Sequence, residues 1–236
     1  RKYKIKKSYL NTNKLKCISK NMIGEIWLGT EDHGIYKYDG NSFTNYSRNN
    51  SPVLCNDINE ICFNYFGTMF IATAEMAIVV YPERIFGQNK NHEWQFWTVE
   101  DTLTTLPDNN VTSIAIKENN EFWFGTKNGL MSVFPEGGLY VTRTFNTANS
   151  DLPQNYITDI KFFGSQLWVA TKSEGFLIYT DNTWERFATF NTELRSNNVS
   201  KILPIAPNKA YLGLTTNSDF TPGFSIFSPT SLTVLA

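Results

Sequence analysis

The 236-residue sequence predicts an all-β fold, a β-propeller of four-stranded antiparallel blades, most simply with five blades. Two observations support this prediction. A short segment with an aromatic residue and, two places on, a small residue recurs five times at a nearly constant period of about 45 residues. An Asn flanked by apolar residues precedes each copy at a similar distance. The five copies are Trp27–Thr30, Phe70–Thr73, Trp123–Thr126, Trp168–Thr171 and Tyr211–Leu214.

The recurring segment reads as a strand that is buried on both faces. Residues two places apart share one face of a strand, so each copy presents a large and a small side chain to the same neighbour. The intervening residues load the opposite face with apolar bulk: Leu28, Ile71, Phe124, Val169 and Leu212. Strands of this kind lie inside a stack of sheets, and four-stranded propeller blades recur at roughly 40–50 residues.

The rest of each repeat supplies three more strands. An apolar alternating run such as Val111–Ile116 follows the repeated Asn and predicts the first strand. A turn, often with Gly, follows the aromatic segment. The third strands are then Ile35–Tyr38, Ala77–Tyr81, Leu130–Phe134, Phe176–Tyr179 and Phe224–Phe227. The fourth strands are Phe43–Tyr46, Trp94–Trp97, Tyr140–Phe145, Trp184–Phe187 and Ser231–Leu235, and no helix longer than a turn is expected.

No repeat can bury its apolar faces alone, so we expect one propeller domain over residues 1–236. Its units cover about residues 9–52, 53–105, 106–151, 152–193 and 194–236. A strand at 3–7 is expected to pair beside Phe224–Phe227 and close the ring, which makes the tail after Pro229 an extra. The alternative is that the chain is an excised part of a larger propeller.

Composition narrows the classes of partner. The formal charge of −1 and the pI near 6.2 give no field that attracts nucleic acid. No apolar run approaches the roughly 20 residues of a membrane helix, so no membrane span is expected in this chain. Phosphate-binding Gly loops are missing and no cofactor is expected. With only His33 and His92, a zinc site of three His is impossible, and no metal is expected.

The repeats resemble the two-component regulator propeller repeat. The residues that carry the resemblance are clearest in two units, Asn109…Trp123–Thr126…Gly129-Leu130 and Asn155…Trp168–Thr171…Gly175-Phe176. Proteins of this family are commonly extracytoplasmic sensor regions of bacterial hybrid histidine kinases, many of which respond to glycan fragments. The resemblance therefore implies a periplasmic or cell-surface location and a role in signal transduction or carbohydrate sensing.

The candidate site is the rim where residues entering the first strands meet the turns between second and third strands. The five repeated Asn are interpreted as structural, because Asn side chains bond nearby backbone and suit turns. Their neighbours differ from blade to blade, as an asymmetric ligand requires: Lys14, Asp57, Asn110, Tyr156 and Asn198. Tyr156 would stack on a sugar face while polar neighbours bond its hydroxyls. A second rim set adds Asp32-His33, Glu75, Lys127-Asn128, Lys172 and Asp219, of which His33 and Lys127 are the chosen candidates.

Catalysis has weaker support than binding. Some five-bladed propellers are glycosidases with paired carboxylates about 5–10 Å apart, one with a raised pKa. Asp57 with Asp32, Asp108 or Asp219 is such a pair on paper, but each has an explanation as a turn residue. We therefore expect no catalytic residues and a non-enzymatic propeller that binds a small molecule or oligosaccharide at the channel mouth. The alternatives are a protein-interaction scaffold that uses the long loop at 83–92, and a glycosidase or lyase.

Overall fold

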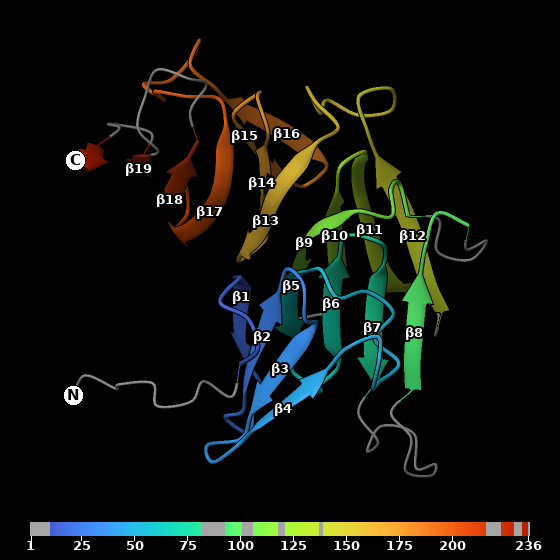
Figure 1. Cartoon of the computed structure of the whole chain (residues 1–236). Helices are drawn as coiled ribbons and strands as arrows, with labels where there is room; N and C mark the ends of the chain where they lie inside the picture. Colours follow the sequence, from blue (N-terminus) through green and yellow to red (C-terminus); the bar gives the residue numbers. More distant parts are fainter. Residues whose placement is uncertain are drawn as a thin grey trace. The chain divides into compact units, whose positions relative to one another are not determined.

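A computed structural model describes residues 10–81, 93–100, 106–117, 121–136, 139–215, 223–228 and 233–235. These residues form five four-stranded sheets, and they contain no helix (Figure 1). In every sheet the strands follow the chain order as an antiparallel meander. The all-β propeller class with five four-stranded antiparallel blades is confirmed.

The chain divides into two compact units, residues 1–96 and 97–236. The prediction that residues 1–236 form one domain stays a prediction. The first unit holds two blades, and its third and fourth strands lie close to the predicted ranges. The first blade is β1 (Leu15–Lys20), β2 (Ile26–Thr30), β3 (Ile35–Tyr38) and β4 (Phe43–Tyr46). The second is β5 (Ile58–Phe63), β6 (Met69–Thr73), β7 (Ala77–Tyr81) and β8 (Glu93–Trp97), whose last residue falls in the second unit.

The second unit holds three blades. The first of them is β9 (Val111–Ile116), β10 (Phe122–Thr126), β11 (Gly129–Glu136) and β12 (Leu139–Phe145). The next is β13 (Ile157–Phe163), β14 (Gln166–Thr171), β15 (Phe176–Thr180) and β16 (Thr183–Phe187). The last is β17 (Val199–Ala206), β18 (Lys209–Leu214), β19 (Gly223–Phe227) and β20 (Thr233–Leu235).

Three predicted features lie outside the described residues: the closing strand at 3–7, the long loop at 83–92 and most of the loop at 215–222. The last blade nevertheless differs from one expectation. β20 pairs with β19 through Phe224↔Leu235, and β18 occupies the other edge of β19. The tail after Pro229 thus supplies a fourth strand instead of an extra segment, because both edges of β19 are already hydrogen-bonded to strands from the same blade.

In the units' earlier blades, the second strand packs its aromatic residue against the next blade of the same unit, as in β2, β10 and β14. Trp123 stacks on Phe145 of its own blade at 5.0 Å between ring centroids and reaches Tyr179 of the following blade at 5.5 Å. A Cβ built on Gly125 would lie 2.8 Å from Cγ2 of Ile157, the first residue of β13. In the first unit, a Cβ built on Gly29 would lie 2.7 Å from Cγ2 of Ile58. The small residue therefore makes room for the first strand of the neighbouring sheet.

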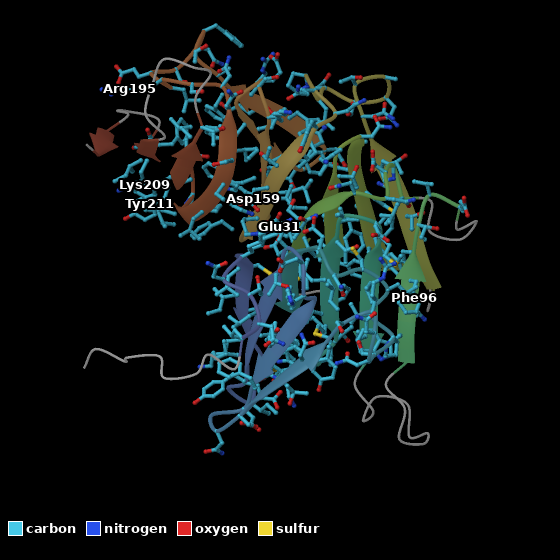
Figure 2. The ribbon with its side chains drawn as sticks, in the orientation of Figure 1. Glu31, Phe96, Asp159, Arg195, Lys209 and Tyr211 are labelled. Atoms are coloured by element: carbon cyan, nitrogen blue, oxygen red, sulfur yellow. The ribbon has the colours of Figure 1, made fainter. Side chains whose placement is uncertain are left out.

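Each first strand carries a β-bulge near its beginning, one or two residues after its first pair with the second strand. In four blades the register with the second strand shifts within the first strand: Leu15/Cys17, Ile58/Glu60, Ile157/Asp159 and Val199/Lys201. In the third blade the shift lies opposite Gly125 and Thr126 of the second strand. The extra residue bends the strand and increases its local twist. In the fourth blade the bulge precedes Asp159, which Figure 2 labels on β13.

Candidate functional site

The repeated Asn residues tie the segments between blades together, as their interpretation as structural residues predicted. The side-chain Oδ1 of Asn56, Asn155 and Asn197 accepts the backbone N–H of the residue eight positions earlier, at 3.0, 2.8 and 2.8 Å. Asn109 accepts the N–H of Val99 at 2.8 Å. The carbonyls of Asn56, Asn155 and Asn197 also accept the N–H of the turn glycine in the preceding blade: Gly34, Gly129 and Gly175.

The residue after each Asn uses its backbone carbonyl in the same way in all five blades. These carbonyls accept the N–H of the residue that follows the second strand, at 2.9–3.3 Å. The five acceptors are Lys14, Asp57, Asn110, Tyr156 and Asn198, the predicted variable positions. At one end of each blade, the segment that leads into the first strand meets the turn between the second and third strands. We call this end of the blade its entry end. Because the main-chain carbonyl makes the hydrogen bond that recurs in every blade, the side chains at these positions are available for other interactions.

In the first unit, the predicted Lys14 and Asp57 form ion pairs at the entry end, and the predicted His33 is hydrogen-bonded to Asp32. The ammonium of Lys14 lies 3.4 Å from Glu31 and 3.7 Å from Asp32, and Nδ1 of His33 lies 2.8 Å from Asp32. Hydrogen bonds from His33 and then Thr12 hold the pKa of Asp32 below its usual value. Asp57 pairs with the ammonium of Lys16 at 2.6 Å. The charges of these side chains are therefore largely compensated within the unit.

In the second unit, the ammonium groups of two lysines lie near the ring of Tyr156. The Nζ of Lys127, which follows β10, is 5.7 Å from the centroid of the Tyr156 ring. The Nζ of Lys172, which follows β14, is 4.7 Å from the same centroid. The structure thus brings together the predicted Tyr156 and Lys127, and adds Lys172 from the second rim set. Asn110 and Asn198 occupy the same position in the blades before and after, each half-buried.

Two polar residues beside Tyr156 were not predicted. Gln154 Nε2 donates to Ser173 Oγ at 2.8 Å, and the backbone N–H of Ser173 donates to Gln154 Oε1 at 2.9 Å. These bonds hold the segment before Tyr156 against the turn that carries Lys172. Nothing in the repeat distinguishes Gln154 from other polar loop residues, so the sequence offered no signal for it.

Sequence reasoning also missed a buried carboxylate between two blades. Asp159 on β13 is 1% exposed, and its Oδ2 accepts the backbone N–H of Ile202 on β17 at 3.0 Å. Its Oδ1 lies 3.1 Å from Nζ of Lys161 and 3.6 Å from Nζ of Lys201. The sequence does hold a signal for this contact, because Asp159 is a single carboxylate inside an otherwise largely apolar strand. A carboxylate in such a strand is almost never buried unless it is paired, so a partner could have been expected.

The carboxylates proposed for catalysis have other roles. Asp57 is ion-paired, Asp32 has a lowered pKa, and Asp108 accepts the N–H of Asn110 at 2.7 Å. A general acid in a glycosidase needs a raised pKa, which is the opposite of what Asp32 shows. Asp219 and His92 lie outside the described residues. The described part of the chain contains no group of three or more His, Cys, Asp or Glu that could hold a metal ion.

Comparison with family models identifies one match. Residues 105–128 match the model described as a two component regulator propeller. This segment covers the repeated Asn109, the strand with Trp123 and the turn to Asn128. No curated protein matches the sequence. The described residues include no helix of the length and apolarity required to cross a membrane.

Several solved structures share the fold. The extracellular domain of a hybrid two-component system from B. thetaiotaomicron matches with a TM-score of 0.75 and 20% identity over 97% of this chain and 29% of its own. A second extracellular domain from the same organism matches with a TM-score of 0.67 and 18% identity, over 96% of this chain and 28% of its own. This chain thus spans less than a third of their length.

Two functionally different proteins are also similar in fold. PorZ, a surface component of the type-IX secretion system of Porphyromonas gingivalis, has a TM-score of 0.65 and 16% identity over 85% of this chain and 31% of its own. Virginiamycin B lyase from Staphylococcus aureus has a TM-score of 0.65 and 12% identity over 97% of this chain and 71% of its own. At these identities the similarities show the fold alone. Together with the matched repeat, they confirm that the chain resembles the two-component regulator propellers.

Proposed function

We propose that this chain is a sensor-type propeller that binds its ligand without transforming it, at the entry end of the second unit. Tyr156 and its two flanking lysines are the observation that carries the proposal. A half-buried aromatic ring offers a flat apolar surface, and the blades before and after carry Asn110 and Asn198 at the equivalent position. This combination suits a sugar ring, which presents an apolar face and hydroxyl groups at its edge.

The proposal places the protein outside the cytoplasm, in the periplasm or on the cell surface. The similar structures that support this location are extracellular domains of two-component systems. It also makes the protein a binding module and not an enzyme, because the candidate carboxylates are engaged in turns and ion pairs. The ligand class that we propose is an oligosaccharide.

Titration calorimetry against a panel of oligosaccharides tests the proposal. Replacing Tyr156 by Ala should weaken binding about tenfold, the equivalent of 1.4 kcal/mol, because the stacking surface is lost. Tyr65→Ala is the matched control, since Tyr65 is 77% exposed in the turn between β5 and β6 at the opposite end of its blade. A panel without any binding, or equal affinities of the Tyr156→Ala variant and the parent, would contradict the proposed site.

The same panel separates binding from catalysis. A lyase or glycosidase would release products from one of the oligosaccharides, and Asp57→Asn would abolish that release. We expect no products with either protein, as measured by chromatography of the incubated sugars.

A further inference from the structure

The two lysines beside Tyr156 differ from most other lysines that the structure describes, because they have no acidic partner among the described residues. Lys14, Lys16, Lys37, Lys117 and Lys161 each lie within 4 Å of a carboxylate oxygen. The ammonium groups of Lys127 and Lys172 lie over the Tyr156 ring, and both residues are exposed. Two positive charges thus lie near one ring, and neither forms an ion pair in the described part of the unit.

Neither Glu174 nor Asp108 is ion-paired with these lysines. Glu174 is the nearest acidic residue in the sequence to Lys172, and its carboxylate is paired with the guanidinium of Arg186. On the other side, the carboxylate of Asp108 accepts the backbone N–H of Asn110. Two ammonium groups therefore lie near the Tyr156 ring, against one carboxylate, that of Asp108, whose partner is a neutral backbone N–H. Both lysines are exposed, and an aromatic ring holds an exposed cation only weakly, so both ammonium groups remain hydrated and able to bind an anion.

Backbone hydrogen bonds hold the segments that carry these three residues. The N–H of Lys127 donates to the carbonyl of Asn110 at 3.3 Å, and the N–H of Lys172 donates to the carbonyl of Tyr156 at 3.1 Å. The bonds between Gln154 and Ser173 hold the same two segments together. A site whose parts are already positioned loses less conformational entropy when it binds.

We infer that the ligand is an anionic saccharide, with a carboxylate or sulfate group next to the sugar ring that stacks on Tyr156. The inference rests on the proposed function and specifies its ligand class. One or both ammonium groups would bind the anionic group, and charge-assisted hydrogen bonds of this kind are stronger than neutral ones. A neutral sugar would use the ring but would gain nothing from the lysines.

Matched pairs of oligosaccharides test the inference. Oligogalacturonate is compared with its methyl ester, which removes only the carboxylate charge, and oligosaccharides of carrageenan are compared with their desulfated forms. We expect binding of at least one charged member, about tenfold or more tighter than its neutral partner. The first pair reports a carboxylate and the second a sulfate.

Variants of the two lysines assign the effect to the site. Lys127→Met and Lys172→Met should each weaken binding of the charged member about five- to tenfold and change binding of neutral sugars less than twofold. Lys209→Met is the control, because Lys209 begins β18 at the other end of its blade (Figure 2). Affinity for the charged member should also fall as salt is raised from 50 to 500 mM, because added salt shortens the Debye length and screens the attraction.

The outcomes separate this inference from the proposed function. Binding of neutral sugars that depends on Tyr156, with no preference for the charged members, overturns the inference and supports the function. Charged sugars that bind equally well to the lysine variants also overturn it. Absence of binding to every sugar in both sets contradicts the proposed function itself.

Discussion

Gly125→Ala tests the packing principle on which the blades depend. The added Cβ would lie 2.5 Å from Ser113 Oγ and 2.8 Å from Ile157 Cγ2, both closer than side-chain carbons approach in real structures. Ser113 and Ile157 are fully buried, so neither has space to withdraw. Overpacking of a close-packed core typically costs about 1–3 kcal/mol. For a chain of this length, about 2 kcal/mol corresponds to a decrease in Tm of roughly 4–8 °C.

Gly213→Ala is the matched control, at the same repeat position in the last blade. There the three nearest atoms belong to β17 of the same blade, and the closest, Ser200 Oγ, is 3.2 Å from the built Cβ. We expect this variant to lie within about 1 kcal/mol of the parent, because the substitution also lowers the entropy of the unfolded chain. Thermal and urea unfolding of the three proteins give the comparison.

A double variant checks the cause. Ile157→Ala removes the Cγ2 atom that Gly125→Ala would meet, so the two changes together should cost less than the sum of the single changes, by about 0.5–3 kcal/mol. If Gly125→Ala is no more destabilising than Gly213→Ala, or if the two changes in the double variant are additive, the small residue is not needed for the approach of the next blade.

Three further predictions concern stability. Asp159→Ala should lower the free energy of unfolding by about 2–3 kcal/mol, because it leaves the N–H of Ile202 without its buried acceptor. Lys201→Met removes only the exposed partner of Asp159 and should cost below about 1 kcal/mol. Equal losses of stability in urea unfolding would argue against the buried contact. Asn197→Ala should cost about 1 kcal/mol by loss of the bond from the N–H of Thr189, and its replacement by Asp, which keeps the acceptor, should cost less in the same assay. Burial raises the pKa of the Cys55 thiol above its ordinary value of 9.0; a raised folded-state pKa gives stability that is complete below the unfolded-state pKa and is lost as the pH rises through the folded-state pKa. Stability should therefore fall more steeply above about pH 9 in the parent than in Cys55→Ala, and identical slopes would refute the assignment.

The strands could be predicted because the residues within and next to each strand form a local sequence pattern that indicates it. Period-two alternation, turn glycines and the repeated aromatic residue place the third and fourth strands within about two residues of their observed bounds. The bulges could not be predicted, since they depend on how each first strand meets its neighbour. A second repeated polar motif was visible but overlooked: Asn50, Asn149 and Asn191 each accept a backbone N–H three residues earlier, at the same distance before the repeated Asn.

The candidate site was predictable in position and less so in composition. The variable residue after each Asn marked Tyr156, because its position recurs and its identity does not. That two lysines would lie over the same ring depends on the spacing between adjacent blades, which no local pattern in the sequence encodes. The buried Asp159 is similar, since its partner Ile202 N–H comes from another sheet.

The main-chain bonds at the entry ends have a consequence for how such a protein can evolve. All five carbonyls after the repeated Asn are bonded through the peptide group, whichever side chain is attached. Gene duplication can therefore add a blade with its scaffold intact, and mutation can afterwards change the side chain at this position without breaking the main-chain bond. The chemistry displayed at the entry ends can then change one blade at a time.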